Sequence, residues 1–471
     1  MSVINTNIPS ITAVHRLAAN QTDLRTRLER LSTGLRINRG RDDPAGLIAS
    51  ETLRNEMRGI SQAIDNSQRA INVLSTAEGA LNEISALLLD IRGLVNHAAN
   101  SGAIGLEELK ADQLQIDSII ESIDRIANTT QFGGAKLING NFEYRTSGIA
   151  ASAVSTLTVF AARVPEGSYQ NITVQVTQSA QTAQVVFAAG SGLSENVTIQ
   201  VAGRVGTEML SFISGANGND IMQAINAVTE QTGVSAIASS DGSVYINSQA
   251  YGKDALVSVK PIDGNFIVST GSTASDYGQD ATVLINGQSA SASGLQASLR
   301  ANGIDVHLAL TADFGTRLGT TTFQITGGGA TYQIGPEVNP SGQVSIGIPN
   351  VGSGNLGNAE VGYLYTLKDG GANSVRGGNF AAAEKILFQS IQQVAVLRGR
   401  LGGLQRNQLE TNINSQRIAL ENVTAAESAI RDANIAAEVA ALTRAQILVQ
   451  STTSILGVAN QLPQSVLSLL G

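Results

Sequence analysis

The stretch LSTGLRINRGRDDPAGLIASETLRNEM, from Leu31 to Met57, stops a helical pattern and soon restarts it. Asp43 before Pro44 is typical of a helix start, because the carboxylate can accept backbone N–H groups and proline fits the first turn. The stretch therefore predicts a linker between two helical layers. Its charged residues are expected to pair with one another or across subunits; they are Arg39, Arg41, Asp42 and Asp43.

Apolar residues near both ends of the chain recur largely at the three-, four- and seven-residue spacings of a coiled-coil seam. Near the N-terminus they are Leu17, Leu24, Leu28, Leu31 and Leu35. Near the C-terminus they are Ile435, Val439, Leu442, Leu456 and Leu462. The pattern predicts that the N- and C-terminal helices pair with each other. The alternative is a self-contained helical bundle at each end.

The middle of the chain has a different composition. All eight Tyr lie in residues 141–380, which are also rich in glycine, whereas residues 45–164 contain no proline. Short runs of β-branched residues between Gly, Asn and Asp predict strands there. We therefore expect an α plus β protein, with N- and C-terminal helices paired in coiled-coil-like bundles. A β-rich α+β insert would form one or two outer domains.

These patterns predict a division into five segments. The two inner terminal helices would be residues 1–42 and 431–471. A helical bundle would consist of residues 43–145, which include a helical hairpin, and of residues 351–430, with a β-rich entry. The β-rich insert would be residues 146–350.

Composition argues against several classes of function. The chain has 471 residues, no Cys and three widely spaced His, so it lacks thiolate metal ligands and a zinc-peptidase motif. We expect no enzymatic activity, metal or cofactor. A net charge of −8 disfavours nucleic acid as a partner. Residues 445–471 are uncharged but contain many Gln, Ser and Thr, so we expect a helix packed in protein rather than a membrane span.

One glycine motif needs separate treatment. GSGNLG, residues 352–357, has the spacing of a dinucleotide-binding loop. That motif requires a following helix, whereas NAEVGYLYTL, residues 358–367, is predicted to form a strand. Cofactor binding is therefore not expected there.

Several segments resemble bacterial flagellins. LERLSTGLRINRGRDDPAGLIASETLRNEM, residues 28–57, resembles the N-terminal flagellin signature. SQRAINVLSTAEGALNEI, residues 67–84, and IDRIANTTQFGGAKLING, residues 123–140, do so too. Residues 399–471 resemble the flagellin C-terminus nearly throughout, and the ending ANQLPQSVLSLLG favours a filament subunit.

The resemblance implies a structural protein that self-assembles into the filament of the bacterial flagellum for swimming motility. It implies secretion through the flagellar type III apparatus without a cleaved signal, and terminal helices that fold only on polymerisation. The implied partners are further copies of the chain, an export chaperone on the C-terminal helix, and hook-associated and cap proteins. Neither nucleic acid nor membrane is implied.

The resemblance also implies two finer features. Flagellins that activate Toll-like receptor 5 carry an arginine–valine–arginine–glutamate–leucine run where this chain has LLLDIRGLVNHAAN, residues 87–100. Here Arg92 and Leu94 match, but Asp90 replaces the first arginine and Gln115 replaces a glutamate of the next helix. We expect weak or absent activation. The uncharged C-terminal helix would line the filament channel, with Gln450 and Gln464 as candidates.

Two alternatives stay open at this point. A hook-associated junction protein shares the terminal helices. A flagellin with a glycan-binding adhesin as its outer domain would share the β-rich middle.

Overall fold

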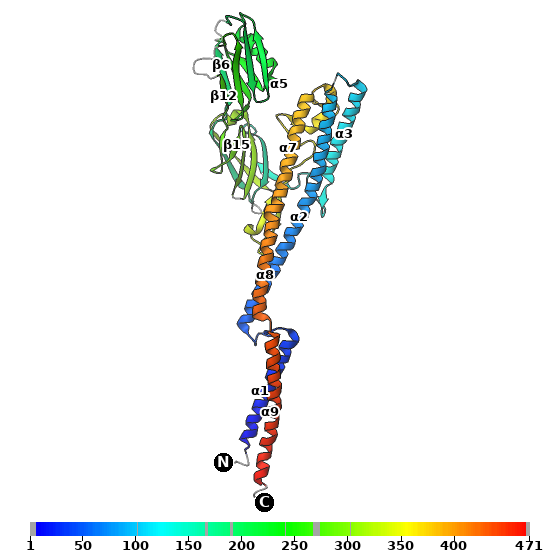
Figure 1. The fold of residues 1–471 in the computed structure, drawn as a ribbon, viewed down its shortest axis with the longest axis vertical. Coiled ribbons are helices and arrows are strands. Elements are labelled where there is room, and N and C mark those ends of the chain that lie inside the picture. Colours follow the sequence, from blue (N-terminus) through cyan, green and yellow to red (C-terminus); the bar gives the residue numbers. More distant parts are fainter. Residues whose placement is uncertain are drawn as a thin grey trace. The chain divides into compact units, whose positions relative to one another are not determined.

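The computed structural model describes residues 6–100, 102–164, 168–188, 192–240, 242–266, 274–301 and 303–467, with side chains up to residue 461 (Figure 1). Long helices form both ends of the chain and β-sheets form the middle, which confirms the predicted α plus β class. The chain divides into two compact units. The first contains residues 1–69, 333–343 and 406–471, and the second contains residues 70–332 and 344–405.

The first unit is mainly helical. It contains α1 (Ile8–Thr33), the beginning of α2 (Pro44–Ala98), α8 (Thr411–Arg431) and α9 (Ile435–Leu467). Helix α1 starts where the Asn7 side chain accepts the Ser10 N–H at 3.1 Å. It ends at Gly34, whose φ of +74° places it in the left-handed region that glycine adopts readily. Helices α2 and α8 are joined by a hydrogen bond of 2.8 Å from Ser50 to Glu427.

The long helices of the second unit are the rest of α2, α3 (Leu106–Thr129) and α7 (Phe380–Leu404). Their buried side chains recur at helical spacing, as expected for helices that share a core. They include Leu74, Leu81, Ile84, Leu88 and Ile91 of α2, Ile116, Ile120 and Ile123 of α3, and Ile386, Val394 and Leu397 of α7. Polar contacts add to this packing: Arg92 pairs with Glu384 at 2.9 Å, and His97 with Asp112 at 2.8 Å.

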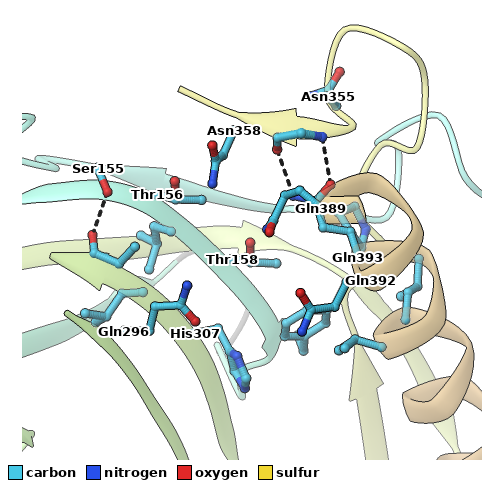
Figure 2. A pocket seen from close by; sticks show the side chains of 18 of the residues that line it. Ser155, Thr156, Thr158, Gln296, His307, Asn355, Asn358, Gln389, Gln392 and Gln393 are labelled. Atoms are coloured by element: carbon cyan, nitrogen blue, oxygen red, sulfur yellow. Dashed lines mark hydrogen bonds between the residues drawn. The ribbon is translucent and has the colours of Figure 1, made fainter. Parts of the chain in front are cut away.

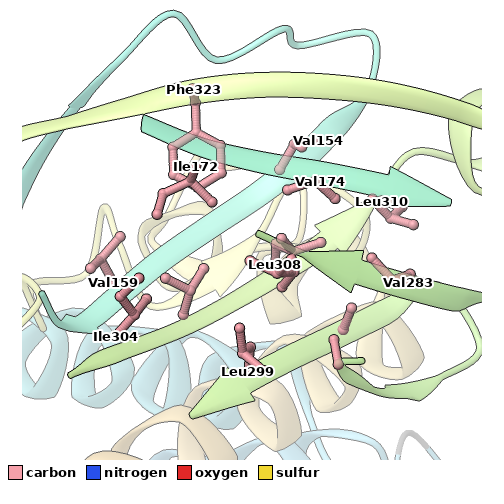
Figure 3. Packing of buried hydrophobic residues seen from close by; sticks show 14 of the residues in the cluster. Val154, Val159, Ile172, Val174, Val283, Leu299, Ile304, Leu308, Leu310 and Phe323 are labelled. Atoms are coloured by element: carbon pink, nitrogen blue, oxygen red, sulfur yellow. The ribbon is translucent and has the colours of Figure 1, made fainter. Parts of the chain in front are cut away.

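The insert contains two separate hydrophobic cores, so it consists of two domains. In the first, a five-stranded sheet of order β14-β13-β5-β18-β3 and a four-stranded sheet of order β15-β16-β17-β4 surround one apolar cluster (Figure 3). Val174, Val306 and Ile325 are fully buried in it. The strands are β3 (Tyr144–Ser147), β4 (Val154–Ala161), β5 (Gln170–Gln178), β13 (Thr282–Ile285), β14 (Gln288–Ser289), β15 (Ser291–Ser293), β16 (Gln296–Ala301), β17 (Ile304–Leu310) and β18 (Gly319–Gly328), with helix α6 (Ala312–Gly315).

The second insert domain combines sheets of order β6-β10-β9 and β12-β11-β7-β8 with helix α4 (Gly218–Ala227). Asn217 and Asp220 form a capping box at the start of α4. Phe187 and Phe266 stack in the core with ring centroids 3.7 Å apart. The remaining elements are β6 (Thr182–Ala188), β7 (Val197–Gly203), β8 (Thr207–Phe212), α5 (Thr229–Thr232), β9 (Val234–Ala238), β10 (Ser243–Tyr251), β11 (Leu256–Asp263) and β12 (Ser275–Tyr277).

The strand predicted over residues 358–367 is largely wrong. The structure has only the two-residue strands β21 (Gly357–Asn358) and β22 (Gly362–Tyr363), followed by a 3-10 helix, Leu364–Leu367. Leu364 and Leu367 are both buried, and a 3-10 turn puts residues three apart on one side. The other short strands are β1 (Gln131–Phe132), β2 (Ala135–Lys136), β19 (Ala330–Gln333) and β20 (Gln343–Ile346).

Among the helices that the structure describes, none is long and apolar enough to cross a membrane.

Candidate assembly interface

Helices α1 and α9 pair in antiparallel orientation along their length. The Asn7 side chain donates to the Ala459 carbonyl at 2.8 Å, and the Asn20 side chain donates to the Leu448 carbonyl at 3.4 Å. The most buried side chains in this pair are small, namely Ala13, Ala445 and Ala459. Because alanine adds little bulk, the two backbones can approach closely at these positions. The predicted pairing of the N- and C-terminal helices is therefore present in this structure.

One carboxylate joins the two helices near the end of α1 and the start of α9. Glu438 is 8% exposed and its oxygens lie 3.0 Å from Arg27 Nη1 and 3.2 Å from Arg30 Nη1. Burial raises the pKa of Glu438, but the hydrogen bonds and charges of the two arginines outweigh that effect and lower the pKa overall. The carboxylate is thus held in its charged form, which fixes the register of α1 against α9.

The segments that leave α1 and enter α9 also pair with each other. Leu35 and Asp432 form an antiparallel β-bridge. The Arg36 N–H donates to the Arg431 carbonyl at 2.7 Å, and the Ala433 N–H donates to the Gly34 carbonyl at 2.9 Å. We call residues 34–36 and 431–433 the paired joint. Both connections between the helical layers therefore run side by side.

The charged residues of the linker form hydrogen bonds and ion pairs with residues that are near them in the sequence. Asp42 accepts the N–H groups of Asn38 at 3.2 Å and Arg39 at 2.9 Å, and the bond from Arg39 holds the pKa of this carboxyl below its usual value. The Asp43 Oδ1 accepts the Gly46 N–H at 2.9 Å, at the start of α2.

Two arginines of the linker pair with acids nearby. Arg39 lies 2.9 Å from Glu29, and Arg41 lies 3.7 Å from Asp42. The contacts of the linker residues therefore form a turn and a helix cap within one chain. These residues are Arg39, Arg41, Asp42 and Asp43.

The pair leaves a large apolar surface in water. Ile8, Ile11 and Val14 of α1 are 62%, 51% and 49% exposed. On α9, Ile447, Ile455 and Val458 are 61%, 55% and 62% exposed. We use the name open apolar face for these six exposed residues, three on the outer side of each helix. Such a surface is typical of a site that another protein covers. The heptad pattern does not predict this surface, although the absence of charge after residue 445 is a signal that α9 is apolar on more than one side.

The predicted seam residues are divided between the two surfaces. Leu17, Leu24, Leu31, Leu35, Leu442 and Leu456 are half-buried. By contrast, Leu28, Ile435 and Val439 are 49%, 50% and 48% exposed. The Leu462 side chain lies outside the described residues. The second group remains a candidate for contacts with other copies.

The other candidate residues lie on α2, α3 and α9. Asp90 and Gln115 are exposed on α2 and α3, and Leu94 is half-buried. Arg92 is already engaged by Glu384 of α7. Gln450 is exposed on α9, whereas the Gln464 side chain lies outside the described residues. Within the described ranges, no three His, Asp or Glu side chains come close enough to hold a metal ion.

Comparison with known proteins identifies relatives of both chain ends. Residues 4–143 match the family described as bacterial flagellin N-terminal helical region, and residues 385–470 match the bacterial flagellin C-terminal helical region. The chain is 28% identical over 470 residues to flagellin B of Vibrio cholerae serotype O1, and 26% identical over 468 residues to flagellin of Bacillus subtilis strain 168. Each alignment covers 99% of both chains.

Solved structures give weaker matches. The hook-associated protein-3 of Legionella pneumophila has a TM-score of 0.29 at 13% identity, covering 80% of this chain and 97% of that chain. The D2-D3 domains of the flagellar cap protein of Serratia marcescens have a TM-score of 0.24 at 18% identity, covering 34% and 92%. These scores are too low to support an argument about function.

The cap at Asp43 gives a testable prediction. Asp43→Ala removes the acceptor for the Gly46 N–H and should destabilise the start of α2 by about 1 kcal/mol. Asp43→Asn keeps an acceptor and loses only the partly exposed pair with Arg36, at 3.7 Å, so it should stay close to the parent protein. Hydrogen exchange of amides 46–50 measures the difference, as faster exchange in the alanine variant. Equal acceleration in both variants would show that charge, not capping, matters here.

Proposed function

Because the chain belongs to the bacterial flagellins, whose members are structural subunits of the flagellar filament, we propose that the open apolar face drives its polymerisation. The protein is not an enzyme; it self-assembles into the extracellular filament that serves swimming motility. In our proposal α1 and α9 become fully ordered only when neighbouring copies cover this face. The single observation that supports it is the exposure of six large aliphatic side chains along one helix pair.

The energetics favour this order of events. Fixing the backbone costs about 1–2 kcal/mol per residue. Burial returns about 25 cal/mol per Å² of apolar surface. Two isolated helices bury only one apolar stripe each, so the free energy gained from burial is small. Neighbouring copies that bury Ile8, Ile11, Ile447 and Ile455 add the apolar area that offsets the cost of ordering.

We also propose the layers that follow from this arrangement. Residues 1–42 and 431–471 would form the inner layer, and residues 43–145 with 351–430 the next helical layer. The insert, residues 146–350, would face solvent. The paired joint at residues 34–36 and 431–433 would connect the inner layer to the next. Electron microscopy of the filament, with a tag inserted in the insert, tests this order.

The open apolar face would also bind other partners of the subunit, before assembly and at the two ends of the filament. An export chaperone that binds α9 would cover Ile447, Ile455 and Val458 until the chain has passed the flagellar type III apparatus. Cap and hook-associated proteins would pair their own helices with the open apolar face at the two filament ends. One substitution therefore tests several partners.

Polar substitution on α9 tests the proposal. The double variant Ile447→Ser, Ile455→Ser removes two buried aliphatic contacts per subunit, each worth about 1.5–3 kcal/mol. The subunit concentration needed for seeded polymerisation should rise by about tenfold or more. Sedimentation of filaments measures this concentration, and a native-gel shift with the chaperone measures its binding, which should also weaken.

Val205→Ser is the matched control. Val205 is 67% exposed, but it lies in the insert. It should polymerise like the parent protein. Unchanged polymerisation of the double variant, or free subunits whose α1 and α9 already resist hydrogen exchange as strongly as in filaments, would contradict the proposal.

The alternatives are less well supported. The matches to flagellins cover 99% of the chain, which favours a filament subunit over a hook-associated junction protein. No comparison favours an adhesin in place of a filament subunit.

We propose in addition that Gln450 and Gln464 line the central channel. Uncharged amides would be wetted without holding a passing chain through ion pairs. Gln450→Lys, combined with Gln464→Lys, should therefore shorten filaments, since a ring of cations would retain acidic segments in transit. Filament length by microscopy measures this, with Gln450→Asn, Gln464→Asn as the uncharged control. Normal length and export in the lysine variant would overturn the proposal.

We propose that this flagellin activates Toll-like receptor 5 weakly or not at all. Asp90 presents a negative charge where an activating flagellin has an arginine, and charge reversal at an interface can cost several kcal/mol. Asp90→Arg with Gln115→Glu should raise signalling by about tenfold or more in a receptor-reporter assay. Glu83→Arg, also on α2, should not. Potent signalling by the unaltered subunit would refute the proposal.

A further inference from the structure

A groove in the second unit separates the sheet β15-β16-β17-β4 from helix α7 (Figure 2). Its cavity volume is about 620 Å³, within the range of sites that hold small molecules. The floor of the groove is formed by side chains that alternate along the strands. Val159 of β4 is buried in the domain core, so Thr156 and Thr158, which alternate with it along the strand, face the groove. The loop that contains Asn355 forms one wall, and Gln389 and Gln392 of α7 form the other.

The polar side chains of the lining are nearly all uncharged amides and hydroxyls. In the part of the chain that the structure describes, the side chains of six lining residues make no hydrogen bond within the protein. They are Thr156, Thr158, Gln296, Asn355, Gln389 and Gln392. Each amide offers two donors and an acceptor, and each hydroxyl offers both. These groups face one another across the groove from four separate segments, so they can engage one ligand from several sides.

Two sets of contacts hold the walls in place. The Gln393 side chain accepts the Gly357 N–H at 2.9 Å and donates to the Gly357 carbonyl at 2.7 Å, which ties the loop to α7. Arg400 of α7 forms an ion pair with Asp305 of β17 at 2.5 Å. Its guanidinium also lies 3.8 Å above the ring of Phe160. The groove is therefore preorganised, which lowers the entropic cost of binding.

The charge of the lining selects the ligand class. No Lys or Arg is among the residues that line the groove, and Glu143 is their single acid. A phosphate, sulfate or carboxylate would find no Lys or Arg among these lining side chains. A ligand rich in neutral hydroxyls would find an array of matching donors and acceptors, and the lining also includes the aromatic residue Tyr363.

From this arrangement we propose that the groove binds a neutral oligosaccharide. The amides of Gln389 and Gln392 hydrogen-bond to hydroxyls on one side of the sugar, and Thr158 and Gln296 bind the other side. This activity is additional to filament formation and does not depend on it. Because α7 supplies a wall, the isolated insert would lack half of the site.

Glycan-array binding by the full-length chain tests the proposal. The array holds neutral oligosaccharides beside their sialylated and sulfated forms, and unpolymerised subunits and filaments are probed in parallel. We expect neutral glycans to be bound in both states, and the acidic forms to be bound less. Gln389→Ala with Gln392→Ala should weaken binding of the best neutral glycan by about tenfold or more.

Gln175→Ala is the matched control, because Gln175 is exposed on β5 of the same domain but does not line the groove. It should bind like the parent chain. Circular dichroism and normal filament formation establish that the double variant is folded. Absence of neutral-glycan binding, a preference for acidic glycans, or equal binding by the double variant and the control would overturn the proposal. Binding by subunits that is lost in filaments would mean that a second copy fills the groove, and would overturn it as well.

Discussion

Two helices cannot cover their own apolar surface. The pairing of α1 with α9 buries small side chains such as Ala13 and Ala445, and it leaves Ile8, Ile11, Ile447 and Val458 in water. The charged contact of Glu438 with Arg27 and Arg30 fixes the register but adds no apolar burial. The two terminal helices therefore have a defined partner in each other, but much of their apolar surface is not buried. In our proposal, polymerisation covers the apolar side chains that the single chain leaves exposed.

The spacing of apolar residues was enough to predict the helices and their pairing, and Asp43 before Pro44 was enough to predict the start of α2. It could not assign each seam residue to a neighbour. Leu28, Ile435 and Val439 follow the same three- and four-residue steps as Leu24 and Leu31, yet they lie on the outer side of the pair. A helix that is apolar on several sides has more than one stripe with this period. Only the partner's position decides which stripe faces inward.

The insert was predictable in class but not in detail. Alternating β-branched runs predict strands, yet composition cannot show that Phe187 and Phe323 belong to different cores. The groove was beyond sequence reasoning, because Thr158, Gln296 and Gln392 come from distant segments and none has an unusual local pattern. Residues 364–367 show a further limit, since a 3-10 turn with buried Leu364 and Leu367 resembles a short strand in sequence.

The paired joint has a mechanical consequence. A single extended strand between two helices can swivel about its backbone bonds. Here the stretch around Leu35 runs beside the stretch around Asp432, held by backbone bonds of 2.7 and 2.9 Å. Twisting one stretch alone would break these bonds, so the two must turn together. Torque applied on one side of the paired joint would therefore be transmitted to the other side, as the rotation of a filament requires.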